Sequence, residues 1–320
     1  MSAVETLLLP ADAEAVALAA ETLREGGLVA FPTETVYGLG ADAAQPSAVA
    51  KIYAVKGRPR FNPLIAHVLN LEAACREALL PPQALRLAEK FWPGALTVVA
   101  PAAPDGAVCD LARAGLPSVA LRAPAHPVAR ALLEVFGGPI VAPSANLSGR
   151  VSPVAASHVA QDLSGRVELI LDGGRAQAGL ESTIVSFLGA EPALLRPGAI
   201  AREDMEAALG GPLAPPSEKI AAPGMTLAHY APRARLRLDA RSLAPGEAGL
   251  DFAGALAVGA EGLDLSPSGD LSEAAANLFA HLRALDDRGV ERIAVAPIPE
   301  RGLGEAINDR LRRAAHRDRQ

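Results

Sequence analysis

Short apolar runs alternate with amphipathic segments along the first 210 residues, and this alternation limits the fold more than any other feature. The apolar runs have the length of buried strands, and the segments between them show helical periodicity. We expect strands at residues 28–31, 64–68, 96–100, 119–122, 140–142, 167–171, 183–187 and 193–195, and helices at residues 12–25, 46–55, 83–91, 127–135 and 202–209. This pattern predicts an α/β fold, with helices packed on a sheet.

The composition changes after residue 210. The segment "GGPLAPPSEKIAAPGMTLAHYAPRA" carries five prolines and little periodicity, which is typical of a linker between domains. A second, smaller α/β pattern follows, with expected strands at residues 236–238, 255–258 and 293–296 and helices at residues 272–285 and 305–316. The sequence therefore predicts domains at residues 1–210 and 233–320, joined by a linker at residues 211–232.

Charge and composition exclude several classes of protein. The chain has 30 Lys and Arg against 36 Asp and Glu, a net charge of −6, which argues against a main role in coating nucleic acid. Cys75 and Cys109 form no metal or disulfide spacing. No apolar run approaches the roughly 18 residues that span a bilayer, and the N-terminus lacks the basic region of a signal peptide. We expect a soluble cytoplasmic protein.

One loop gathers an unusual number of cations. The stretch "KGRPRFNPL", residues 56–64, holds Lys56, Arg58 and Arg60 beside a glycine and two prolines that forbid a regular helix. Three cations on a stiff, irregular loop bind an anion or are merely solvated at the surface. Taken alone, the stretch does not decide between these interpretations.

Four further polar stretches fall where predicted strands end, which is where open α/β sheets bind their ligands. Their hydroxyls, amides and arginines suit phosphate and carboxylate groups. Each could also be an ordinary turn or helix cap, but their occurrence together favours a site. No P-loop, dinucleotide fingerprint, HExxH or GxSxG motif occurs, so we expect positioning and charge neutralisation rather than a covalent enzyme intermediate. The stretches are "PTETVYGLG", "SVALRAP", "APSANLSGRVSP" and "ESTIVSF…LLRPGAI".

Taken together and in this order, these stretches closely resemble the two-domain threonylcarbamoyl-AMP synthase family. Other matching pieces are "FWPGALTVV", "ILDGG" and the linker's "APGMTLAHYAP", whereas the C-terminal part is similar only in position and α/β pattern. The resemblance implies a twisted mixed sheet with helices, of the YrdC-like type, followed by a linker and a smaller Rossmann-like α/β domain.

The resemblance also implies a reaction. The amine of L-threonine captures bicarbonate or CO2 as a carbamate, which attacks the α-phosphate of ATP and releases pyrophosphate. The product, threonylcarbamoyl-AMP, supplies the threonylcarbamoyl group for adenosine 37 of tRNA. Mg2+ is expected with ATP, and tRNA threonylcarbamoyl-transfer proteins are expected as downstream partners, with at most weak direct contact to tRNA and none to a membrane.

Site residues follow from the matching motifs. The resemblance implies that Lys56 and Arg58 are catalytic and grip the ATP phosphates, and that Arg122 pairs bidentately with the threonine carboxylate. Other implied threonine contacts are Thr35, His67, Ala142 and Ser182. Other implied ATP contacts are Asn62, Ser118, Ser144, Asn146, Ser152, Arg196 and Tyr230. No protein-held metal is expected.

The linker and two rival functions remain open at this stage. In the family that the chain resembles, the linker reaches back over the active site, so "HYAP" (residues 229–232) is expected to exclude water from a labile product; the alternative is a plain tether. One rival function is a carbamoyl-phosphate-dependent carbamoyltransferase, although the cysteine pairs and acylphosphatase module of such proteins are not visible. The other is a double-stranded RNA-binding module, which the net charge of −6 disfavours.

Overall fold

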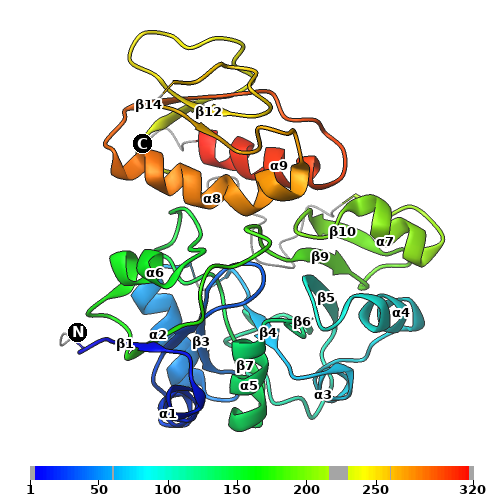
Figure 1. The fold of residues 1–320 in the computed structure, drawn as a ribbon. Coiled ribbons are helices and arrows are strands. Elements are labelled where there is room, and N and C mark those ends of the chain that lie inside the picture. The colour runs from blue at the N-terminus through cyan, green and yellow to red at the C-terminus, as the bar shows by residue number, and fades with distance from the viewer. Residues whose placement is uncertain (1–3, 60, 216–229, 260, 317–320) are drawn as a thin grey trace.

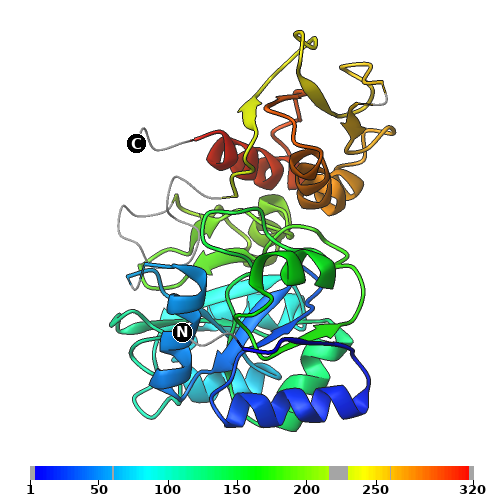
Figure 2. The ribbon, with the colours of Figure 1, turned by 90° about the vertical axis from the view of Figure 1, so that its left-hand side faces the viewer.

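The computed structural model describes residues 4–59, 61–215, 230–259 and 261–316. The chain forms a larger N-terminal part and a smaller C-terminal part that lies against it (Figures 1 and 2). Each part has its own sheet, and the larger sheet is mixed while the smaller one is parallel. The predicted fold class, a mixed α/β sheet followed by a small Rossmann-like domain, is confirmed.

Within the described residues the larger sheet has ten strands, in the order β1-β8-β2-β3-β7-β4-β6-β5-β9-β10. Neighbours in this sheet are often far apart in the sequence, as with β4 and β6. The strands are β1 (Leu7–Pro10), β2 (Val29–Phe31), β3 (Gly38–Asp42), β4 (Ile65–His67), β5 (Leu96–Pro101), β6 (Ser118–Arg122), β7 (Ile140–Val141), β8 (Leu169–Asp172), β9 (Thr183–Ser186) and β10 (Ala193–Arg196).

Helices cover both faces of this sheet. Strand β2 illustrates why its residues are all apolar: Ala30 packs into one core cluster, whereas Val29 and Phe31 pack into another on the opposite face. The second cluster includes the buried faces of α1 and α5. The helices of the larger part are α1 (Ala13–Arg24), α2 (Pro46–Lys56), α3 (Leu71–Glu77), α4 (Pro82–Phe91), α5 (Pro127–Phe136), α6 (Ala156–Leu163) and α7 (Arg202–Leu209).

In the smaller part, α8 and α9 lie between the four-stranded sheet and the larger part (Figure 1). One core cluster joins the two parts, because Val36 and Leu180 of the first pack with Leu278 and Phe279 of the second. The strand order is β11-β14-β12-β13. These elements are β11 (Arg235–Arg237), β12 (Ala248–Asp251), β13 (Leu263–Asp264), α8 (Leu271–Asp287), β14 (Arg292–Val295) and α9 (Leu303–Ala315).

Two local expectations were wrong. Residues 38–40, expected as the end of the loop "PTETVYGLG", begin strand β3 instead. Gly40 lets this strand approach the ring of Phe31, because a Cβ at Gly40 would lie 2.8 Å from Phe31 Cε1. The strand expected at residues 255–258 is a turn. Asp251 Oδ1 there accepts hydrogen bonds from the backbone N–H groups of Phe252 and Leu256, and the strand itself comes earlier, as β12.

The predicted linker is described only in part. Residues 211–215 and 230–232 belong to the structure, while residues 216–229, and with them His229, lie outside the described residues. Among the residues that the structure does describe, no helix has both the length and the apolar character needed to cross a membrane.

Candidate active site

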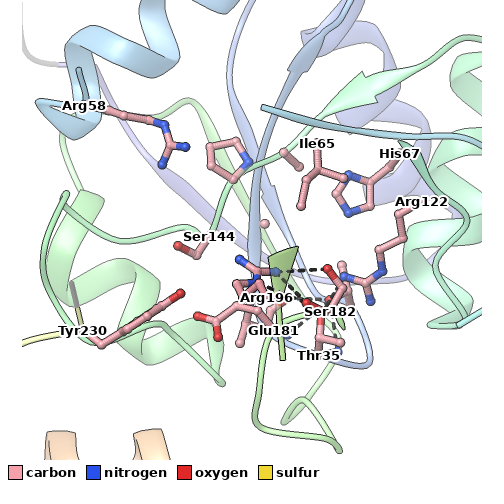
Figure 3. A pocket seen from close by; sticks show the side chains of 15 residues that line it. Thr35, Arg58, Ile65, His67, Arg122, Ser144, Glu181, Ser182, Arg196 and Tyr230 are labelled. Atoms are coloured by element: carbon pink, nitrogen blue, oxygen red, sulfur yellow. Dashed lines mark hydrogen bonds between the residues drawn. The ribbon is translucent and has the colours of Figure 1, made fainter. Parts of the chain in front are cut away.

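A pocket that is partly open to solvent lies beside the larger sheet near the C-terminal part (Figure 3). Nine residues that the sequence singled out line it: Thr35, Arg58, His67, Arg122, Ala142, Ser144, Ser182, Arg196 and Tyr230. They come from loops and strand ends far apart in the sequence, and the sheet brings them together. The remaining lining residues are Thr33, Val36, Gly38, Ile65, Pro143 and Glu181.

His67 and Arg122 stand side by side at one end of the pocket. They are the last residues of β4 and β6, which run parallel, and the register pairs His67 with Arg122. Side chains of paired residues in neighbouring strands point to the same face. The sheet thus places a cation and an imidazole on one wall.

The guanidinium of Arg122 is held on three sides. Its Nε donates to the carbonyl of Gly94 at 3.2 Å, and its Nη1 donates to Thr35 Oγ1 at 2.7 Å. Its Nη2 lies 2.7 Å from Glu34 Oε1, an ion pair without the alignment of a hydrogen bond. Two of its five N–H donors are hydrogen-bonded and a third faces Glu34, so two remain for a ligand. Arg122 is therefore rigid and still able to bind a carboxylate.

His67 is neutral in this environment. Burial lowers the pKa of its imidazole to about 3, and the charge of Arg122 contributes to this shift. Nδ1 has no hydrogen-bond partner among the described residues, although His67 is only 3% exposed. A buried polar atom without a partner is costly in a folded protein. This nitrogen is thus available to a ligand of the pocket.

Arg58 lines the side of the pocket opposite Arg122 (Figure 3). Helix α2 ends at Gly57, whose φ of +61° lets the chain turn so that Arg58 N–H bonds back to the carbonyl of Tyr53. The guanidinium donates to the carbonyl of Pro63 at 3.1 Å. Burial lowers the pKa of Arg58 to about 10, so the side chain stays charged at neutral pH. It gives the pocket a fixed positive charge at this end.

Arg196 and Ser182 form the floor between the two ends. Ser182 precedes β9, and its hydroxyl lies 2.7 Å from Thr97 Oγ1. Arg196, at the end of β10, donates to the carbonyl of Ser182 at 2.7 Å and to its hydroxyl at 3.2 Å. A third buried guanidinium, after those of Arg122 and Arg58, is thereby held next to a hydroxyl that lines the pocket.

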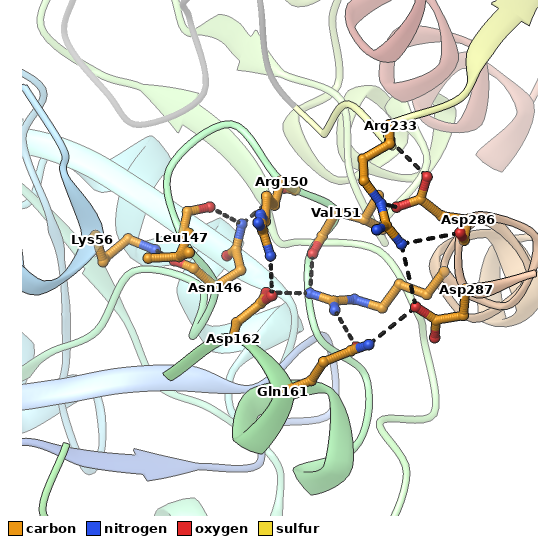
Figure 4. Close-up of polar contacts among 11 residues, drawn as sticks. Lys56, Asn146, Leu147, Arg150, Val151, Gln161, Asp162, Arg233, Asp286 and Asp287 are labelled. Carbon is orange, nitrogen blue, oxygen red and sulfur yellow. Dashed lines mark hydrogen bonds and ion pairs between the residues drawn. The ribbon is translucent and has the colours of Figure 1, made fainter. Parts of the chain in front are cut away.

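Lys56 does not line the pocket, and its predicted grip on the ATP phosphates stays a prediction. Its ammonium is buried and donates to two main-chain carbonyls, that of Ser144 at 2.5 Å and that of Asn146. Its own carbonyl accepts from the N–H of Ser148. Lys56 therefore fixes the loop of residues 144–148, and Figure 4 shows it beside Asn146 and Leu147.

Four other predicted ATP contacts are buried near the pocket without lining it. Asn62 and Asn146 each keep a side-chain oxygen without a partner in the described part of the chain. Ser118 begins β6, and Ser152 donates to Glu181 Oε1 at 2.6 Å. Their contacts to a nucleotide stay predictions.

Glu34 and Glu181 are the two functional candidates that sequence reasoning missed. Glu34 belongs to "PTETVYGLG", where only the threonines drew notice, and Glu181 belongs to "ESTIVSF". Carboxylates are unexpected in a site for anions. The structure explains both, because each is paired with a buried arginine: Glu34 with Arg122, and Glu181 with Arg310. The only sequence signal was their position inside the motifs.

A metal site is not built by the side chains that the structure describes. No group of three or more His, Cys, Asp or Glu residues lies close enough there to hold an ion. Glu181 has both oxygens engaged, one by Ser152 and one by Arg310.

Family comparisons match both parts of the chain. Residues 21–198 match the Sua5/YciO/YrdC family, described as "Telomere recombination", and residues 200–316 match "Threonylcarbamoyl-AMP synthase, C-terminal domain". The chain is 43% identical over 321 residues to the threonylcarbamoyl-AMP synthase of Bacillus subtilis, which covers 94% of this chain and 92% of that protein. Sequence similarity thus extends over nearly the whole length.

A solved structure gives the same result in three dimensions. Pyrococcus abyssi Sua5 complexed with L-threonine superposes with a TM-score of 0.88 and 37% identity, covering 98% of this chain and 97% of that one. A full-length HypF also matches, with a TM-score of 0.50, but at 20% identity and over only 30% of its own length. The likeness to HypF shows a shared fold alone.

Proposed function

The chain belongs to the threonylcarbamoyl-AMP synthase family, and we propose that it condenses L-threonine, bicarbonate or CO2, and ATP to threonylcarbamoyl-AMP with release of pyrophosphate. The observation that carries this proposal is the arrangement of one pocket: Arg122 beside His67 at one end and Arg58 at the other. Two anionic ligands bound at these ends would meet between them. Such alignment accounts for much of the rate gain in phosphoryl-group chemistry.

The threonine end is Arg122 with the groups around it. The two free N–H donors of Arg122 suit the carboxylate of an amino acid, and the hydroxyls of Thr35 and Ser182 suit its polar side chain. Neutral His67 can accept a hydrogen bond through Nδ1. A lack of positive charge on His67 also favours the unprotonated amine that carbamate formation requires.

The ATP end is Arg58 with Arg196 and Ser144. A carbamate oxygen would form its bond to the α-phosphorus while the bond from that phosphorus to the bridging oxygen breaks, and the electron pair would leave with pyrophosphate. Arg58 and Arg196 are charged, buried and fixed by main-chain carbonyls, so they can stabilise this charge without reorganising. Tyr230 lines the same pocket and can exclude water from the adenylated product.

Magnesium is proposed to enter on the ATP phosphates as part of the substrate. The described side chains provide no cluster of ligands for a resident ion. We also propose that the enzyme acts in the cytoplasm and passes its product to proteins that transfer the threonylcarbamoyl group to tRNA. A net charge of −6 supports at most weak direct contact of the enzyme with tRNA.

The test is pyrophosphate release from ATP with each proteinogenic amino acid, in the presence and absence of bicarbonate. We expect release that requires both L-threonine and bicarbonate, and a product with the mass of threonylcarbamoyl-AMP. Release driven by carbamoyl phosphate without threonine would support the carbamoyltransferase instead. Salt-sensitive binding of double-stranded RNA, with no release under any condition, would support an RNA-binding module.

A further inference from the structure

A fully buried arginine of the C-terminal part reaches the wall of the pocket. Arg310, on α9, is 0% exposed, and its Nε donates to Glu181 Oε2 at 2.8 Å. The other oxygen of Glu181 accepts from Ser152 at 2.6 Å. Glu181 itself lines the pocket next to Arg196 (Figure 3). The contact therefore joins the last helix of the chain to the site in the first domain.

The same guanidinium lies against Tyr230. Its carbon is 5.2 Å from the centre of the Tyr230 ring, and the ring stacks on Phe279 of α8 at 5.6 Å. Tyr230 has a φ of +65°, a conformation that bulky residues rarely adopt. Such backbone strain persists only where the surroundings hold the residue in place. Arg310 and Phe279 hold Tyr230, whose side chain lines the pocket, in this conformation.

Charge explains why an arginine is needed here. An ionised Glu181 without a partner would repel the phosphates of ATP, which Arg58 and Arg196 attract. Burial by itself raises the pKa of Glu181, but the charges of Arg310 and Arg196 outweigh burial and lower it, so the carboxylate stays ionised. Arg310 thus neutralises a negative charge that the first domain alone would expose to the nucleotide.

We propose that Arg310 is a positioning residue of the active site: it neutralises Glu181 and holds Tyr230, so that the pocket accepts ATP only when the C-terminal part is docked. The proposal rests on the function proposed above. It assigns the C-terminal part a direct role in nucleotide binding, through one residue that does not line the pocket.

The experiment compares Arg310→Met with the double variant Glu181→Gln/Arg310→Met. Binding of ATP is measured by calorimetry without threonine, and KM for ATP and for threonine by pyrophosphate release. We expect Arg310→Met to weaken ATP binding at least tenfold and to leave KM for threonine within threefold. The double variant removes the unpaired carboxylate, and the long apolar side chain of methionine still packs against the Tyr230 ring. Its ATP affinity should therefore return to within about threefold of that of Glu181→Gln alone.

Arg283→Met is the matched control. Arg283, on α8, is also buried and also joins the two parts, by an ion pair to Asp162 at 2.7 Å, but neither residue lines the pocket. We expect it to lower stability and leave ATP affinity within threefold. Arg310→Lys, which keeps the charge, serves where Arg310→Met does not fold, and should bind ATP with intermediate affinity.

Equal loss of ATP affinity in the Arg310 and Arg283 variants would overturn the proposal, because domain docking alone would then explain both. Lack of recovery in the double variant would overturn it as well. Unchanged ATP binding in a folded Arg310→Met protein would also overturn the proposal about Arg310, but it would not contradict the proposed function. Failure of the wild-type protein to release pyrophosphate would refute the proposed function, and the calorimetry would still decide on Arg310.

Discussion

Glu34 Oε1 lies 2.7 Å from Nη2 of Arg122, the residue that we propose to hold the carboxylate of threonine. Both side chains are largely buried, at 16% and 5% exposure. A buried guanidinium is costly unless a counter-ion or hydrogen bonds compensate its charge. Glu34 supplies one whether or not substrate is present, and threonine then uses the N–H donors of Arg122 that remain.

Replacing Glu34 by glutamine should lower stability in a pH-dependent way. We expect Glu34→Gln to lose about 2–3 kcal/mol of unfolding free energy at pH 7, since it leaves Arg122 without its counter-ion. Burial alone raises the pKa of Glu34, but the charge of Arg122 overcomes this and holds the pKa below its usual 4.5. The carboxylate therefore stabilises the fold fully above pH 4.5, and its contribution is lost as the pH falls through the folded pKa.

Urea denaturation of both proteins at pH 7 and at a series of pH values below 4.5 measures this difference. The gap between wild type and Glu34→Gln should shrink as the pH falls. A gap that stays constant over this series would mean that Glu34 is not ionised against Arg122.

Removing the guanidinium of Arg122 should abolish the use of threonine. Loss of one partner of a buried charge pair costs ~2–5 kcal/mol, so Arg122→Ala should raise KM for threonine at least thirtyfold in the pyrophosphate-release assay. Arg122→Lys should not restore it, because an ammonium cannot form a fork with a carboxylate.

Arg130→Ala is the control for Arg122. Arg130 lies on α5, donates to the carbonyl of Leu69 and does not line the pocket. Its threonine KM should stay near the wild-type value. Equal effects of the two variants would contradict the threonine site.

Arg58 and Lys56, two residues apart, should behave differently. Arg58→Ala should weaken ATP binding at least tenfold with a small change in stability, since it removes a charge from the pocket. Lys56→Met should leave the carbonyls of Ser144 and Asn146 without a donor and lower the unfolding free energy by about 2–4 kcal/mol.

Calorimetry with ATP and urea denaturation measure the two effects. ATP affinity of Lys56→Met should stay within threefold of wild type as long as the protein is folded. A stable Lys56→Met protein that no longer binds ATP would support the direct phosphate contact that the sequence predicted.

Gly198 permits the close packing behind Glu181 and Ser182. A Cβ at this position would lie 2.4 Å from the carbonyl oxygen of Glu181 and 2.5 Å from the carbonyl carbon of Ser182. Gly198→Ala should therefore push these pocket residues out of place, cost about 1–3 kcal/mol and raise KM for both substrates. Urea denaturation and pyrophosphate release measure this.

Gly57→Ala gives the comparison for Gly198. No atom lies within 4 Å of a Cβ built at Gly57, but its φ of +61° disfavours alanine. We expect a loss of about 1 kcal/mol from the backbone alone. If Gly198→Ala were as stable and as active as Gly57→Ala, the prediction would be wrong. The backbone behind the pocket would then shift to accommodate the added Cβ at little cost.

Much of the local structure could be predicted from residue patterns. Helices such as α7 and strands such as β5 begin and end within a residue of their expected limits, because periodicity, prolines and glycines act over a few neighbouring residues. The strand expected at residues 255–258 failed for a local reason too: the Asp251 side chain bonds to backbone N–H groups and turns the chain. Such a competing hydrogen bond cannot be predicted from the pattern of apolar residues.

The candidate site contains both features that could be predicted from the sequence and features that depend on the tertiary structure. The motifs identified Arg58, His67 and Arg122 as candidates, since their residue types and loop positions are visible in the chain. That His67 and Arg122 are neighbours depends on the pairing of β4 with β6, which are separated by more than 50 residues. Strand pairing is decided by the energy of the whole sheet and core, which no local window of sequence contains.

The different roles of Lys56, Arg58 and Arg310 depend on what surrounds each side chain in the folded protein. Lys56 and Arg58 carry the same charge and belong to the same stretch of sequence. In the fold, however, the ammonium of Lys56 points toward two carbonyls, whereas the guanidinium of Arg58 points toward the pocket. Arg310 carried no signal at all, because its partners Glu181 and Tyr230 approach it only when the two parts of the chain are packed together. The sequence by itself determined which groups were available; the tertiary structure determined which of them meet, since a charge takes its role from what surrounds it once water is excluded.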